Sequence, residues 1–202
     1  MRKADLRKNH EKFESAISRY ADLLARLLPA QRVVRTVGDK REIAEGALLK
    51  LCSHWEAFIV EELVDCVNID SSALGNYLGL SLPKHLSRDL CEAILMRDGY
   101  LDFRSIGDLK GTAKKILPNA INPFEKISKP VCDKIDEVYK IRNYLSHRSK
   151  ASAKALMRMY STNHDMKNFL EPGQFLLAYY SKRLLGYFNS FVDASNQMAT
   201  II

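Results

Sequence analysis

The 202-residue sequence lacks the features that mark several large classes of protein. No apolar run approaches the roughly 18 to 20 residues that span a bilayer, so a transmembrane helix and a membrane partner are not expected. Residues 1–14 are rich in charge and contain no apolar segment of a secretory signal, so we expect a cytoplasmic protein. Nine glycines and six prolines are too few for an all-β protein rich in turns.

Motifs for metals, redox chemistry and nucleotide hydrolysis are also missing. The four cysteines, at positions 52, 66, 91 and 132, form no C-x-x-C pair, and we expect inert thiols. His10, His85 and His164 each stand isolated among polar residues, and His54 has no second ligand at helical spacing. The segment GNYLG at residues 75–79 lacks the Lys-Ser/Thr of a phosphate-binding loop. The sequence therefore predicts no metal and no cofactor.

Apolar residues recur at helical spacing almost throughout, which predicts an all-α fold. A first helix with apolar positions from 13 to 28 stops near Pro29. Asp39, with Glu42 three residues later, is predicted to cap a long second helix that ends near Ile69. Gly46 inside it indicates either a close helix crossing or simple toleration of glycine.

The rest of the chain predicts shorter elements. Pro83 is expected to begin a helix that Gly99 ends, and another amphipathic helix ends at Pro118. Residues 119–126 are expected to form a loop, and Ser128 caps a helix that runs to about Ser149. Further expectations are a short helix near residues 156–160, a break near Pro172 and a last helix over 176–198. No linker divides the chain, so we expect one domain over residues 1–202, with residues 71–118 as an insert.

Positive charge is concentrated in one stretch. The chain has 31 Lys and Arg against 24 Asp and Glu, a net charge of +7. Residues 138–164 contain no acidic residue and six cations: Lys140, Arg142, Arg148, Lys150, Lys154 and Arg158. Charge alone leaves two interpretations open, a phosphate-binding field or a solvated helix face.

A histidine in this stretch favours the phosphate-binding interpretation. Arg142 precedes His147 by five residues, and Asn143 lies four residues before His147. On a helix Asn143 and His147 share a face, whereas Arg142 is rotated from His147 by about 140°, so the arginine must bend or act on a site completed by another chain. Histidine can exchange protons near neutral pH, and arginine binds phosphate oxygens. The set therefore suits RNA cleavage, with Asn143 orienting the imidazole or binding phosphate.

The Arg-x(4)-His pattern with a polar residue after the arginine resembles the HEPN superfamily (higher eukaryotes and prokaryotes nucleotide-binding), helical bundles of which many are RNases. Residues 49–59, LKLCSHWEAFI, are similar to the Trp-Glu-x-Phe helix of its RiboL-PSP-type branch. The match covers roughly residues 43–148. It implies an up-down helical bundle, here with extra short helices inserted between the second long helix and the motif helix.

The resemblance also implies an activity and partners. HEPN RNases cleave single-stranded RNA without a metal, by attack of the 2′-OH, and leave 2′,3′-cyclic phosphate and 5′-OH ends. One histidine does not supply both a base and an acid, and members of the superfamily commonly dimerise so that two motifs face a shared groove. We therefore expect a homodimer with a composite active site. A role as a toxin or a phage-defence effector, restrained by an antitoxin protein, is also implied.

Residue roles follow from the motif and its surroundings. The catalytic candidates are Arg142, Asn143, His147 and Glu56, where the glutamate would hold Arg142 or His147 unless it is a surface residue. The candidate RNA-binding residues are Lys140, Tyr144, Arg148, Lys150 and Lys154. Tyr144 would either stack a base or pack against a neighbouring helix, and Trp55 is expected in the core.

Two other functions stay open at this point. A HEPN-like bundle would bind RNA, nucleotide or a partner protein without cutting. A helical DNA-binding regulator is weaker, because the chain shows no compact helix-turn-helix spacing.

Overall fold

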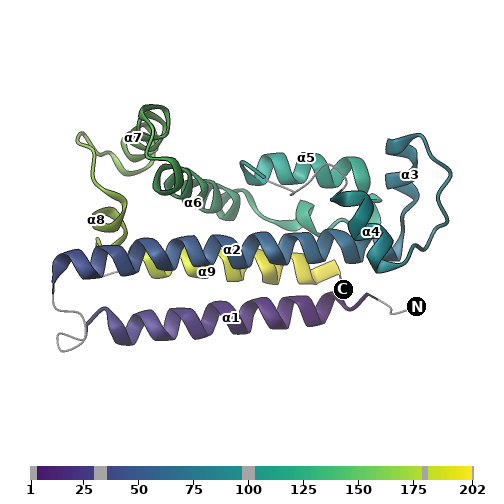
Figure 1. The fold of residues 1–202 in the computed structure, drawn as a ribbon, viewed down its shortest axis with the longest axis horizontal. Helices are drawn as coiled ribbons and strands as arrows, with labels where there is room; N and C mark the ends of the chain where they lie inside the picture. The colour runs from purple at the N-terminus through teal and green to yellow at the C-terminus, as the bar shows by residue number, and fades with distance from the viewer. Residues whose placement is uncertain (1–3, 30–35, 97–102, 179–181, 202) are drawn as a thin grey trace. The chain divides into compact units, whose positions relative to one another are not determined.

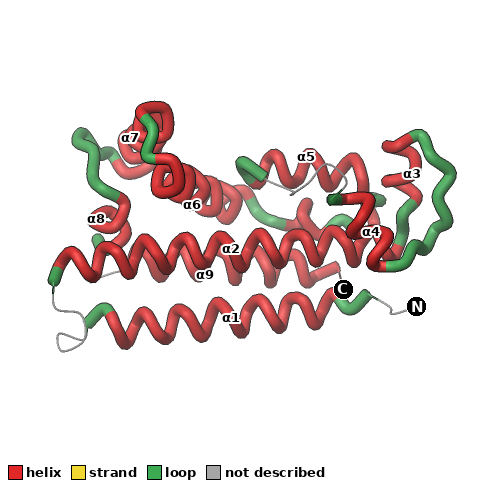
Figure 2. Tube along the Cα trace, viewed as in Figure 1, coloured by secondary structure: helices red, strands yellow, loops and turns green. Residues whose placement is uncertain are grey.

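The computed structural model describes residues 4–29, 36–96, 103–178 and 182–201 (Figure 1). These residues form helices, turns and loops, and no strand occurs among them (Figure 2). The predicted all-α class is confirmed. The α-helices are α1 (Leu6–Leu27), α2 (Val37–Ile69), α3 (Ser72–Leu78), α4 (Arg88–Leu95), α5 (Ile106–Ile116), α6 (Lys129–His147), α7 (Lys150–His164), α8 (Pro172–Leu176) and α9 (Lys182–Met198). Three short 3₁₀ helices are η1 (Asn119–Ile121), η2 (Pro123–Lys126) and η3 (Ala199–Ile201).

Contacts within the chain divide it into two compact units. The first unit comprises Met1–Glu14, Trp55–Cys132 and Asp193–Ile202, and the second comprises Ser15–His54 and Asp133–Val192. The division falls inside α1, α2, α6 and α9, so each of these helices supplies residues to both units. The expected single domain stays a prediction.

The first unit has an aromatic core built on α2. Trp55 is fully buried, which confirms its predicted place in the core. Phe58 stacks on Phe13 of α1 with ring centroids 4.6 Å apart, and Trp55 lies 5.7 Å from the same ring. In this unit α3 packs against α5, whose buried residues include Ile106, Leu109 and Ala113.

The second unit has its core between α6, α7, α8 and the buried part of α9. The ring of Tyr160 on α7 lies 4.2 Å from Phe175 on α8, and both side chains are fully buried. Gly173 sits where a Cβ atom would lie 2.6 Å from the Cβ of Arg41, so only glycine lets α8 approach α2 this closely.

Some helices begin at a different capping residue from the one predicted. Helix α2 ends at Ile69 as expected, but Thr36 caps it. The Asp39 amide donates to Thr36 Oγ1 at 3.0 Å, and the Thr36 amide donates to Asp39 Oδ2 at 2.8 Å. Asp39 is therefore the third residue of a reciprocal capping box and not the cap. A close crossing at Gly46 is also wrong, because nothing lies within 4 Å of a Cβ placed there.

The middle of the chain contains further differences. Helix α4 begins after Ser87, whose Oγ accepts from the Leu90 amide at 3.3 Å, so Pro83 does not begin it. Helix α3 was not predicted, α8 forms where a break was expected at Pro172, and the expected loop at 119–126 contains η1 and η2. The end of α5 before Pro118 is confirmed. Gly99 and Tyr179 lie outside the described residues.

The expectation of inert thiols can be compared directly with the burial of the cysteines. Cys52, Cys66 and Cys91 are buried and Cys132 is half-buried, and burial raises the pKa of the Cys66 thiol, as inert thiols require.

No helix in the described ranges has the length and apolar character needed to cross a membrane.

Candidate functional site

The predicted motif lies at the C-terminal end of α6 in the second unit. Ile135, Val138 and Ile141 are fully buried and fix one face of the helix in the core. Arg142 and Asn143 are half-buried beside that face, and His147 is exposed in the last turn. The helix thus presents the motif at the boundary between core and solvent.

A sharp corner joins α6 to α7 directly after the histidine. Arg148 adopts a φ of 44°, a left-handed conformation that costs a non-glycine residue about 1 kcal/mol, and its amide donates to the Tyr144 carbonyl at 2.7 Å. Ser149 then caps α7, because its Oγ accepts from the Ser152 amide at 3.1 Å while Ser152 Oγ accepts from the Ser149 amide. The exposed His147 is followed at once by a helix with exposed Lys150 and Lys154.

The arginine arm folds over its own helix. Arg142 Nη1 donates to Asn143 Oδ1 at 3.2 Å. Asn143 lies one turn before His147 on the same face, so the guanidinium bends toward the side of the helix that carries the histidine, one of the two alternatives that the spacing left open. The His147 ring has no hydrogen bond or ion pair to another described residue.

Tyr144 is held inside the protein. It is 8% exposed, and its ring meets Phe169 edge-on with centroids 5.3 Å apart. Its hydroxyl donates to Glu171, 3.3 Å from one carboxylate oxygen and 3.4 Å from the other. Burial and the neighbouring negative charge of Glu171 raise the pKa of Tyr144. This environment favours the packing interpretation over base stacking.

Two carboxylates that the local sequence does not reveal lie beside the motif. Glu45 Oε2 of α2 is 3.7 Å from Arg148 Nη2, and Glu45 Oε1 accepts from the Gly173 amide at 2.8 Å. Glu171 is the second. These two carboxylates make the electrostatic potential around the motif less positive than the acid-free stretch of sequence predicts.

The other predicted residues are placed as follows. Lys140 is exposed on α6, so Lys140, Lys150 and Lys154 are all accessible to a phosphate backbone. Glu56 is half-buried on α2 and belongs to the first unit, whereas the motif belongs to the second. A role for Glu56 in holding Arg142 or His147 stays a prediction.

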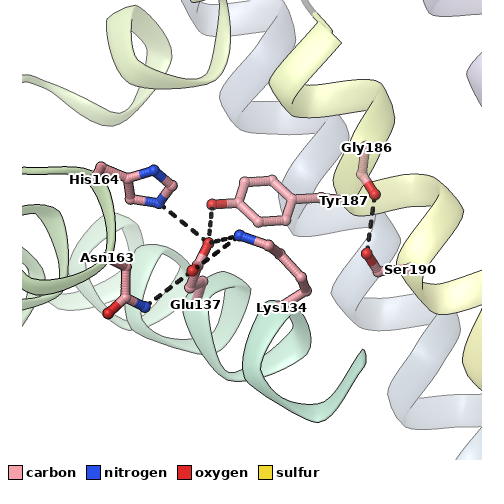
Figure 3. Close-up of polar contacts among 7 residues, drawn as sticks. All are labelled: Lys134, Glu137, Asn163, His164, Gly186, Tyr187 and Ser190. Carbon is pink, nitrogen blue, oxygen red and sulfur yellow. Dashed lines mark hydrogen bonds and ion pairs between the residues drawn. The ribbon is translucent and has the colours of Figure 1, made fainter. Parts of the chain in front are cut away.

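A second polar cluster, which the sequence analysis missed, surrounds Glu137 in the same unit (Figure 3). Glu137 is 2% exposed and accepts from Tyr187 Oη at 2.7 Å, Asn163 Nδ2 at 2.9 Å and Lys134 Nζ at 3.1 Å. His164 Nε2 lies 3.3 Å from the same carboxylate, so the prediction that His164 is isolated is wrong.

The electrostatics of this cluster follow from its hydrogen bonds. Burial raises the pKa of Glu137, but the donors Tyr187, Asn163 and Lys134 together outweigh burial and bring it below its ordinary value. Burial lowers the pKa of His164, only partly opposed by Glu137, so its ring is neutral at pH 7. A sequence signal did exist, because Glu137 occupies the apolar stripe of α6 four residues before Ile141.

A third cluster lies in the first unit and contains His10, which is not isolated either. His10 Nδ1 is 2.8 Å from Ser195 Oγ, and His10 Nε2 lies within ion-pair distance, 3.2 Å, of Glu62 Oε1. Burial raises the pKa of Glu62, and His10 offsets this only in part. Ser195 and Glu62 are fully buried and His10 is 4% exposed, so this serine, histidine and carboxylate are closed to a substrate.

Comparisons with known proteins do not assign a family. No protein-family model, curated protein or solved structure matches the chain. In the described part of the chain, no three His, Cys, Asp or Glu side chains gather in a way that could hold a metal ion. The HEPN resemblance therefore rests on the motif residues alone.

Proposed function

We propose that this protein is a HEPN-like, metal-independent endoribonuclease whose site is the C-terminal end of α6. One observation carries the proposal. An exposed histidine without a described polar partner stands one turn after an asparagine that receives the arginine guanidinium at 3.2 Å. Exposed lysines on α6 and α7 supply the field for an RNA backbone.

Each motif residue has a role in the proposed cleavage of RNA. A base removes the proton of a ribose 2′-OH, the 2′ oxygen forms a bond to phosphorus, and the bond from phosphorus to the 5′ oxygen breaks as an acid protonates that oxygen. His147 supplies one of the two proton transfers. Arg142 stabilises the charge on the phosphorane, and Asn143 holds the guanidinium in place. The products are a 2′,3′-cyclic phosphate and a 5′-OH.

The second proton transfer requires a second group. We infer a homodimer in which His147 of the partner subunit faces the same RNA strand, so that each chain completes the other's site. A toxin or phage-defence role, with an antitoxin as a further partner, is the biological setting that the resemblance suggests.

One observation favours a second candidate, a HEPN-like module that binds RNA, nucleotide or a partner protein without cutting. Arg148 pairs with Glu45 and Tyr144 donates to Glu171, so one side chain inside the motif and one directly after it have internal partners. Such contacts stabilise the end of α6 without any need for catalysis.

Cleavage of single-stranded RNA in EDTA separates the two candidates. Wild-type protein should cleave RNA and leave an all-DNA strand of the same sequence intact, because DNA lacks the 2′-OH. His147→Ala and Arg142→Ala should lose activity, while Lys167→Ala, at an exposed position outside the motif, should keep it. Equal activity in all four proteins would refute the mechanism, and RNA binding without cleavage by wild type would favour the binding module.

A further inference from the structure

An open cavity of about 630 Å³ lies beside the Glu137 cluster, within the second unit. Its volume falls in the range of small-molecule sites, roughly 300 to 1,000 Å³. Its described lining comes from α6, from the end of α7 and from α9: Lys134, His164, Lys182, Arg183, Gly186, Tyr187 and Ser190. The proposed RNase mechanism uses none of these residues.

The charge around the cavity is positive. Three cations line it among the described residues, Lys134, Lys182 and Arg183, and no carboxylate does. Glu137, a carboxylate just behind the lining, pairs with Lys134 at 3.1 Å. Counting that carboxylate against the three cations leaves two positive charges, and His164 is neutral at pH 7. A cavity with this balance favours an anion.

The walls are fixed before any ligand arrives. The Arg183 guanidinium lies 3.9 Å from the centre of the Phe175 ring, and its Nη1 donates to the Phe175 carbonyl at 2.9 Å. Glu137 holds Lys134, His164 and Tyr187 from a second side, as the dashed contacts in Figure 3 show. Such preorganisation lowers the entropic cost of binding.

Gly186 makes room in the wall formed by α9. Nothing lies within 4 Å of a Cβ placed there, and Ser190 Oγ donates to its carbonyl at 3.0 Å (Figure 3). Apolar surface is also present, because the Tyr187 ring and the lysine stems line the same space. The occupant therefore needs an apolar part as well as a charge.

We propose that this cavity binds a small molecule that carries a phosphate or carboxylate group on an apolar body. The anionic group lies between Lys182 and Arg183, and the apolar part lies along Tyr187 and Gly186. A soluble phosphate ester and a lipid headgroup share this chemistry.

Titration calorimetry with phenyl phosphate tests the proposal on the full chain. Phenyl phosphate should bind with a Kd of about 1 mM or tighter, and more tightly than inorganic phosphate or neutral benzyl alcohol. Octyl phosphate replaces the ring with an alkyl chain like that of a lipid tail, so tighter binding of octyl phosphate identifies a lipid source and tighter binding of phenyl phosphate a soluble one. Either order supports the site.

Variants separate the cavity from general surface charge. Lys182→Ala and Arg183→Gln should each weaken binding about tenfold, since each removes one charged donor. Gly186→Leu should also weaken it, with no change in charge, because the new side chain fills the cavity. Lys167→Ala removes a lysine that does not line the cavity and should bind like wild type.

The proposal would be overturned by no binding of phenyl phosphate, by equal loss in Lys167→Ala and Lys182→Ala, or by unchanged binding in Gly186→Leu with an unchanged melting temperature. Displacement of phenyl phosphate by single-stranded RNA would assign the cavity to the RNA path and also overturn it. His147→Ala should bind phenyl phosphate normally, so the outcome is independent of the proposed RNase activity.

Discussion

Two parts of α6 place a polar side chain in opposite environments, one buried and one exposed. On the buried face, Glu137 is 2% exposed and accepts hydrogen bonds from α6, α7 and α9. About three turns later, His147 is exposed and has no polar partner among the described residues. The first arrangement stabilises the fold, whereas the second leaves an imidazole open to solvent, as the proposed mechanism requires. Stability and activity should therefore respond to different substitutions on the same helix.

The largest effect is expected at the exposed end. His147→Ala should lower the rate of RNA cleavage by about 10² to 10⁴-fold, the usual contribution of a general acid or base. Its free energy of unfolding in urea should stay within about 0.5 kcal/mol of wild type, because the side chain makes no described polar contact. Ser146→Ala, at the neighbouring exposed position, is the matched control and should keep full activity.

On the buried face of α6, a substitution should lower stability and leave RNA cleavage intact. Glu137→Ala should lower the free energy of unfolding by about 3 kcal/mol, since it leaves the Tyr187 hydroxyl and the Asn163 amide without their acceptor. Below its melting temperature the variant should still cleave RNA. A loss of cleavage with an unchanged unfolding curve would contradict the division between the two parts of the helix.

The pH dependence of Glu137 provides a finer test. Its pKa is lower in the folded chain than the ordinary 4.5, so its charged form stabilises the fold above about pH 4.5 and this contribution is lost as the pH falls through the folded value. The stability difference between wild type and Glu137→Gln should shrink in acid. A difference that grows below pH 4.5 would mean that the donors do not outweigh burial.

Glu62 extends the comparison to a buried carboxylate with fewer donors. Burial raises its pKa above 4.5, so the folded chain favours the protonated form, and stability falls as the pH rises from about 4.5 through the folded value. Glu62→Gln should therefore be more stable than wild type by about 1 kcal/mol at pH 8. This gain should disappear below about pH 4.5, and a loss of stability at pH 8 would show that the contact with His10 dominates.

The smallest effect concerns the exposed lysines. Lys154→Ala should weaken RNA binding uniformly across sequences and reduce the slope of log K against log salt by about 1. Lys126→Ala, at an exposed position of the first unit, is the control. Equal slopes in Lys154→Ala and wild type would remove Lys154 from the RNA contacts.

The same contrast explains what the sequence could predict. Apolar spacing correctly located α2, α5 and α6, because a helix that buries one face shows a period near 3.6 in its own residues. The placement of Asn143 and His147 on one face also follows from spacing within one helix. Thr36 and Ser87 were missed as caps because several polar residues near each helix start compete for that position.

Spacing within one helix does not predict contacts with residues from distant segments of the chain. Glu45 and Glu171 reach the motif only through packing of α2 and the segment before α8, so nothing near Arg142 indicates them. The Glu137 network needs Asn163 and Tyr187 from two other helices. Its one local signal was a carboxylate on an apolar stripe, and that signal predicts burial with partners but not which partners.

The chemistry of the RNA ends tests the central claim most directly. Single-stranded RNA is incubated with the wild-type protein in EDTA, and the products are identified by mass spectrometry. The proposed mechanism predicts 2′,3′-cyclic phosphate and 5′-OH ends that are absent with His147→Ala. Ends with a 5′-phosphate and a 3′-OH, or the same cyclic ends from His147→Ala, would contradict it.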